Sequence, residues 1–213
     1  MKKEINFTRI HQNRKDFLSK YKNKDHVVIE GTNNILISVP HGVAQVRLGK
    51  YKHYELGSIA TALFLKDNTN SYLIAKTKTN NDDVNFDENS PYKDSIKNLV
   101  KVNKVKYILD FHGLSSSRNC DVNLGTHIGI NVANNLELFN TLVKTLVDNG
   151  FIVSIDQPFM AGRQTIAGSI KKEFDFTWTL QIEINSKITN EIKHFEKFKK
   201  LLEIFSEFIN SIK

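Results

Sequence analysis

Three apolar runs, far apart along the chain, each lead to a side chain that can bind a metal or carry a proton. They are Ile35–Gly42, which contains His41, Tyr107–Gly113, which contains His112, and Trp178–Asn185, which contains Glu183. Short apolar runs of this kind are typical of strands buried on both faces of an α/β sheet. Such sheets bind ligands just beyond the carboxyl ends of their strands. We therefore expect the three side chains to meet at one edge of a sheet.

The rest of the chain alternates between helical and extended patterns. The patterns predict helices over Phe7–Tyr21, Glu55–Leu65, Ser95–Val102, Asn134–Asp148 and Asn190–Ile212. They predict strands over His26–Glu30, Ile35–Val39, Ser71–Lys76, Lys106–Phe111, Asp121–Thr126, Phe151–Ile155 and Thr177–Ile184. The turn residues Gly31–Asn34 predict a hairpin between the first two strands, and the long polar segment Thr77–Pro91 predicts a connector that is either functional or mobile. Strands that alternate with helices indicate one α/β domain over residues 1–213, with a mixed, mainly parallel sheet between helices.

Composition narrows the classes of protein that fit this pattern. The 213 residues are 40% hydrophobic and 25% charged, as in soluble globular proteins, and no apolar stretch is long enough to span a membrane. The first six residues lack the apolar core of a secretion signal, so we expect a cytoplasmic protein. The net charge of +7 comes mainly from lysines on helical stretches, and with only five arginines we do not expect nucleic acid as the primary partner. The pattern leaves the oligomeric state open.

Six short motifs, in order, resemble the N-formylglutamate amidohydrolase family of the zinc carboxypeptidase-like superfamily. They are Val39–Gly42, Glu55 at the start of a helix, Asp83–Asn85, Asp110–Gly113, Gly125–Thr126 and Gln181–Asn185. The resemblance runs over most of the chain, from about residue 35 to residue 185. It implies a carboxypeptidase/phosphorylase-like fold, zinc, and hydrolysis of an amide bond in a small N-acylated amino acid.

Zinc chemistry is also indicated by the residue types. A catalytic zinc ion takes three protein ligands and keeps a fourth position open for water. His41 and His112 stand in the same setting, at the end of a buried strand and before a glycine, so we expect both to bind one zinc ion per chain. Glu55 is the expected third ligand, a role that the resemblance supports; helix capping is the alternative. His53 is the rival ligand, because it is only two residues away from Glu55.

Glu183 lies between two isoleucines in an apolar strand. An ionised carboxylate is rarely buried in such a place without a partner, because burying an unpaired charge is energetically costly. We predict that it is the catalytic base, which takes a proton from water and passes it to the leaving nitrogen. A structural ion pair is the alternative. Asp110 is two residues before His112 and should lie on the same face of its strand. It is predicted to orient a ligand histidine, to bind the metal itself, or to act as a structural cap.

The substrate is expected to carry a carboxylate, and arginine is its usual partner. The family that the chain resembles commonly has an arginine after the Asp-x-Asn motif, but here Phe86 follows it. Arg163, in a glycine-containing loop before the last strand, is therefore the first candidate for this role, and Arg118 is the second. Arg47 is predicted to polarise the scissile carbonyl or to bind substrate.

Two asparagines in the motifs, Asn85 and Asn185, are further candidates for substrate contacts. Because the usual arginine is missing, cleavage of a γ-glutamyl peptide or an acyl-aspartate remains an alternative activity. A binding protein that keeps the fold without turnover is the non-enzymatic alternative. The chain has no serine-nucleophile or nucleotide-binding motif, and a nucleophilic Cys120 would leave His41 and Glu183 unexplained.

Overall fold

The computed structural model describes residues 5–212. The expectation of no secretion signal rests largely on residues 1–4, which lie outside this range. Nine strands are present in the described residues: β1 (His26–Ile29), β2 (Ile35–Val39), β3 (Gln45–Arg47), β4 (Lys50–Lys52), β5 (Tyr72–Lys76), β6 (Tyr107–Leu114), β7 (Val122–Gly125), β8 (Val153–Ile155) and β9 (Trp178–Asn185). None of the helices in residues 5–212 combines the length and the apolar character needed to cross a membrane.

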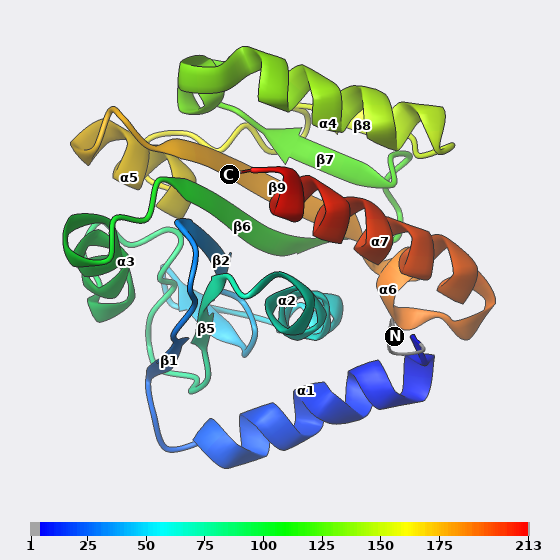
Figure 1. The fold of residues 1–213 in the computed structure, drawn as a ribbon. Helices are drawn as coiled ribbons and strands as arrows, with labels where there is room; N and C mark the ends of the chain where they lie inside the picture. Colours follow the sequence, from blue (N-terminus) through cyan, green and yellow to red (C-terminus); the bar gives the residue numbers. More distant parts are fainter. Residues whose placement is uncertain (1–4, 213) are drawn as a thin grey trace.

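Seven of these strands form one twisted sheet in the order β1-β5-β2-β6-β9-β7-β8 (Figure 1). The four central strands β5, β2, β6 and β9 run parallel, while β1 and β7 are antiparallel to their inner neighbours. The predicted α/β class, with a mixed and mainly parallel sheet, is confirmed. The parallel order brings the carboxyl ends of β2, β6 and β9 to one edge.

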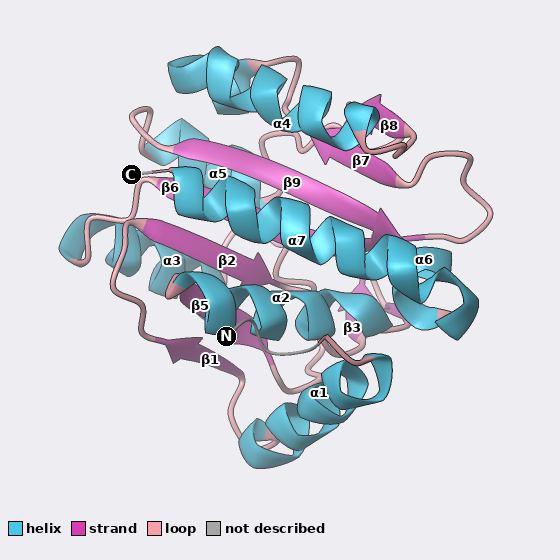
Figure 2. Ribbon diagram, turned by 45° about the vertical axis from the view of Figure 1, so that its right-hand side comes forward, coloured by secondary structure: helices cyan, strands magenta, loops and turns pink. Residues whose placement is uncertain are grey.

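Helices cover both faces of the sheet. They are α1 (Phe7–Tyr21), α2 (Leu56–Thr69), α3 (Pro91–Val102), α4 (Leu136–Asp148), α5 (Ile166–Glu173), α6 (Ser186–Asn190) and α7 (Phe195–Ser211), with short 3₁₀ turns at Ile130–Asn135 and Ile192–His194. Helices α1, α2, α4 and α7 contribute to a larger core on one face, as Figure 2 shows from the front, and α3 and α5 contribute to a smaller core on the other.

The two faces of the central strands differ at their carboxyl ends. On β6, Leu109 and Phe111 belong to the larger core, so the alternating residues Asp110 and His112 point to the face of α3 and α5. On β9, Leu180 and Ile182 belong to the larger core, which turns Gln181 and Glu183 to that same opposite face. The sheet is thus apolar on one side and polar on the other at the edge formed by the carboxyl ends of these strands.

The structure differs from the sequence predictions in four places. The first two strands are present but do not form a hairpin, because β5 lies between them and pairs with both. The small hairpin of β3 and β4 has only three residues in each strand, which is too short for a clear alternating pattern. Helix α5, of eight residues, was not predicted. The predicted C-terminal helix is divided into α6, a 3₁₀ turn and α7.

Candidate metal centre

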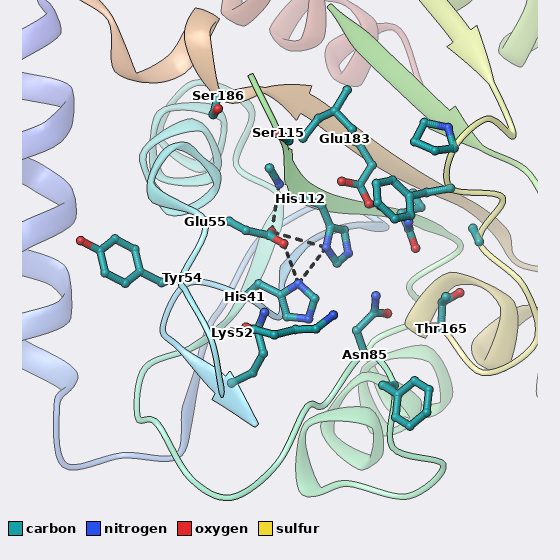
Figure 3. A pocket seen from close by; sticks show the side chains of 18 of the residues that line it. His41, Lys52, Tyr54, Glu55, Asn85, His112, Ser115, Thr165, Glu183 and Ser186 are labelled. Carbon is teal, nitrogen blue, oxygen red and sulfur yellow. Dashed lines mark hydrogen bonds and ion pairs between the residues drawn. The ribbon is translucent and has the colours of Figure 1, made fainter. Parts of the chain in front are cut away.

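Two histidines and a glutamate converge at the edge formed by β2, β6 and the start of α2. Atoms of His41, Glu55 and His112 that can bind a metal all lie within 4.8 Å of one another. Nδ1 of His41 is 2.8 Å from Oε1 of Glu55 and 3.2 Å from Nδ1 of His112. Figure 3 shows the two rings and the carboxylate pointing toward one another. The structure therefore brings the three predicted ligands together.

The side chain of Glu55 is directed to the histidines instead of its own helix. Glu55 is the N-cap residue of α2, but its carboxylate makes no capping hydrogen bond. Its Oε2 accepts a hydrogen bond of 2.9 Å from the backbone N–H of Gly113. A Cβ atom at Gly113 would lie 3.0 Å from that of Glu55, so glycine gives the room for this approach. The geometry favours the ligand role over the capping role.

Two buried carboxylates hold the outer nitrogens of the histidine rings. Nε2 of His41 lies 3.0 Å from Asp83 Oδ1, and Nε2 of His112 lies 3.0 Å from Asp110 Oδ2. Both aspartates are fully buried, and a carboxylate in this position accepts a hydrogen bond from the Nε2–H group of the ring. Asp110 is also held by the hydroxyl of Ser38 at 2.7 Å. This arrangement turns both Nδ1 atoms inward, as in metal sites where a carboxylate orients each ligand histidine.

The electrostatics of the cluster favour a positive charge at its centre. Burial lowers the pKa of His41, but the carboxylates of Glu55 and Asp83 outweigh it and raise that pKa to about 8. For His112, burial is likewise outweighed by Asp110 and Glu55, and the pKa lies well above its usual value. Burial raises the pKa of Glu55, yet the two histidines bring it down to about 2. Two imidazole rings and three carboxylates thus make a place where positive charge is stabilised.

Glu183 lies beside this cluster on the neighbouring strand. It is the register partner of His112 between β9 and β6, and it is only 5% exposed. Burial, which outweighs the attraction of His112, raises the pKa of Glu183 to about 7. Nε2 of Gln181 donates a hydrogen bond of 2.9 Å to Oε1 of Glu183. No ion pair involves Glu183 within residues 5–212, so the structure gives no support to the alternative of a structural ion pair.

A cavity of about 1160 Å³ opens over the cluster. His41, Glu55, His112 and Glu183 line it, together with Arg47, Asn85 and Arg163. Seven of the nine predicted site residues therefore share one cavity. His53 also lines it, but its ring is exposed and packs edge-on against Tyr51, away from the three-residue cluster.

The other two predicted residues, Arg118 and Asn185, are not among the described residues that line the cavity. The side-chain nitrogen of Asn185 donates to the backbone carbonyls of Arg118 and Cys120, at 3.1 and 2.9 Å. Its oxygen accepts from the N–H of Lys187 at the start of α6. Asn185 thus joins the end of β9 to a loop and caps a helix, a placement that differs from the predicted substrate contact.

Two site residues had no predicted role of their own. Asp83 was noted only as part of a motif, and its contact with His41 joins residues 42 positions apart. Gln181 lies on the same face of β9 as Glu183, two residues before it. This spacing is the sequence feature from which its contact with Glu183 could have been predicted.

No family model and no curated protein sequence matches this chain. Solved structures do match it. A gene product from Agrobacterium tumefaciens is 13% identical, with a TM-score of 0.63 over 91% of this chain and 98% of that one. N-formylglutamate amidohydrolase from Ralstonia eutropha is 11% identical, with a TM-score of 0.55 over 88% and 96%. A bacteriophage poly-gamma-glutamate hydrolase is 15% identical, with a TM-score of 0.51 over 92% of both chains. A metallo-carboxypeptidase from Burkholderia cenocepacia is 10% identical, with a TM-score of 0.53 over 95% of this chain and 69% of that one.

The fold is carboxypeptidase-like. The predicted resemblance is thereby confirmed at the level of the fold.

Within this carboxypeptidase-like fold, Phe86 stands where the resemblance implies an arginine. The guanidinium of another arginine, Arg47, packs on the ring of Phe86. The guanidinium of Arg47, from β3, lies 4.9 Å from the centre of the Phe86 ring. Nε of Arg47 donates to Asp83 at 2.7 Å, so one carboxylate holds both Arg47 and His41. Burial raises the pKa of Asp83, but His41 and Arg47 outweigh it and keep that pKa well below its usual range.

Proposed function

We propose that this protein is a zinc-dependent hydrolase that cleaves the amide bond of a small N-acylated amino acid. The observation that carries the proposal is the convergence of three side chains that can bind a metal beside a buried carboxylate with a raised pKa. The structural similarity to N-formylglutamate amidohydrolase from Ralstonia eutropha supports the substrate class.

His41, Glu55 and His112 would hold one zinc ion per chain. Two imidazole nitrogens and a carboxylate oxygen suit zinc, and an open cavity above them leaves room for water and substrate. When bound, zinc supplies a Lewis acid that polarises the scissile carbonyl and makes water more acidic. Asp83 and Asp110 keep the ligand nitrogens turned inward.

Glu183 acts as the base and then as the acid. Because Gln181 donates to Oε1, the other carboxylate oxygen, Oε2, is the one left to take a proton from water. Glu183 then delivers that proton to the nitrogen of the leaving amine. A pKa near 7 suits both steps at neutral pH.

The cavity offers two arginines and an amide to hold the substrate. Arg47 is fixed by Asp83 on the His41 side and polarises the scissile carbonyl. Arg163 is exposed and has no ion-pair partner in residues 5–212, so it receives the substrate carboxylate. Asn85 accepts from the N–H of Ile166 with its oxygen, at 2.8 Å, which leaves its NH₂ group for the substrate.

A γ-glutamyl peptide is the second candidate substrate. Small-molecule sites usually occupy about 300–1,000 Å³, and the volume of about 1160 Å³ lies above that range. The name of the bacteriophage poly-gamma-glutamate hydrolase is consistent with a longer substrate.

One experiment tests the proposed function. Zinc content is measured by elemental analysis, and the same preparation is assayed on formylated and acetylated glutamate and aspartate and on γ-glutamyl dipeptides. We expect zinc and turnover of at least one compound, with Glu183→Gln as the inactive control. Zinc without turnover of any compound would favour the binding-protein alternative, and equal turnover by the control would trace the activity to a contaminant.

A further inference from the structure

A second, smaller cavity adjoins the first and is built from different elements. It has a volume of about 440 Å³ and lies between α3, α5 and the loop that precedes α5. Arg163 and Gln164 line both cavities, so the two meet at the arginine proposed to receive the substrate carboxylate.

Cationic groups dominate the lining of the second cavity. Lys93, Lys97, Arg163 and Lys172 line it, against the two carboxylates Glu88 and Glu173. Glu173 is already paired with Lys97 at 2.9 Å and with Lys101 at 3.6 Å. Arg163 and Lys172 have no carboxylate within 4.0 Å among residues 5–212.

The buried lysine of this lining makes no ion pair within residues 5–212. Lys93 is 1% exposed, and its amine donates to the backbone carbonyls of Asp87 and Gln164. These bonds fasten the wall shared by the two cavities to α3. Burial, partly offset by Asp110 and Asp87, lowers the pKa of Lys93 to about 8. An anion in the cavity would stabilise the charged form of this amine.

We infer that the second cavity is a subsite for a further carboxylate of an elongated acidic substrate, which extends past Arg163 from the metal centre. The inference rests on the proposed function and narrows its substrate class to short acidic chains. In an N-acylated glutamate, a γ-linked extension is attached through the side-chain carboxylate and leaves the α-carboxylate for Arg163, and this extension would continue into the second cavity. Lys172 and Lys97 would meet its charge.

The test compares an acylated glutamate with the same compound extended by one and by two γ-linked glutamates. For the wild-type protein we expect kcat/KM to rise roughly fivefold with extension, the size that a partly exposed ion pair allows. Lys172→Glu should remove this gain and leave cleavage of the unextended compound unchanged. Lys200→Glu, an exposed lysine of α7 outside both cavities, carries the same change in net charge and should keep the gain.

Two outcomes would overturn the inference: no gain with extension, or the same loss in both lysine variants, which would indicate general electrostatic attraction. Sulfate is titrated at constant ionic strength as a second arm. Sulfate binding that depends on Lys172 without any gain from extension would assign the cavity to a free anion and overturn the subsite. If the wild-type protein cleaves none of the compounds, the proposed function fails, and calorimetric binding of the longest compound to wild type and both variants still decides on the cavity.

Discussion

Replacing Glu183 with glutamine separates a catalytic from a structural carboxylate. The two side chains have nearly the same volume, and the oxygen of a glutamine at this position can still accept the 2.9 Å hydrogen bond from Gln181. The three predicted ligands are untouched, so zinc should stay bound. The amide cannot take a proton from water, and loss of such a base typically lowers a rate by 10²–10⁴. We expect kcat to fall at least about 10²-fold, equivalent to about 2.7 kcal/mol of barrier.

The same substitution should have the opposite effect on stability. Because the folded protein raises the pKa of Glu183 to about 7, its proton is held more tightly in the folded state than in the unfolded one. The stability due to that proton is full below the unfolded pKa, which is about 4.3, and is lost as the pH rises toward 7. Metal-free Glu183→Gln should therefore be more stable than metal-free wild type at pH 8. The difference should be at most about 4 kcal/mol, because one pKa unit corresponds to about 1.36 kcal/mol.

Urea denaturation at pH 5 and pH 8, zinc analysis and steady-state kinetics on one preparation check these expectations together. A functional carboxylate predicts retained zinc, slower turnover and a gain of stability that is present at pH 8 and smaller at pH 5. Destabilisation at pH 8, or wild-type kcat, would refute the reasoning and return Glu183 to a structural role.

Three further predictions concern the residues around the base and the metal. Gln181→Met should lower kcat roughly 10-fold with KM nearly unchanged, but should lower kcat little further in a Glu183→Gln background, because the hydrogen bond that it removes acts only through the base. Gln45 is the other buried glutamine of the cavity, so Gln45→Met is the matched control. Equal losses of kcat in both backgrounds would mean that Gln181 has a structural role. Arg163→Ala should raise KM at constant kcat, since a substrate carboxylate is bound alike in ground and transition states, whereas wild-type constants would remove it from the site. Asp83→Asn should weaken zinc affinity about 10- to 100-fold, as expected for a residue that orients a ligand; an unchanged affinity in a chelator titration would contradict that part of the account.

The positions of His41 and His112 could be predicted because both follow apolar strands, and a parallel sheet brings strand ends to one edge. Their distant partners could not. Asp83 reaches His41 from a loop without regular structure, and such a contact leaves no periodic pattern. The hairpin error has a similar cause, since Gly31–Asn34 is a good local turn signal, whereas the insertion of β5 between β1 and β2 depends on pairing across the chain. The position of Arg47 depends on its hydrogen bond to Asp83 and its packing on Phe86, contacts between residues 36 and 39 positions apart that leave no local pattern in the sequence.

Zinc content tests the central claim most directly. The protein is purified without added chelator, and zinc per chain is measured by elemental analysis for wild type, His41→Ala and His112→Ala, with His53→Ala as the matched control. We expect about one zinc ion per chain in wild type and in the control, and loss of most of it in the other two variants, because two remaining ligands bind far more weakly than three. Full zinc occupancy in both His41→Ala and His112→Ala would contradict the proposed centre.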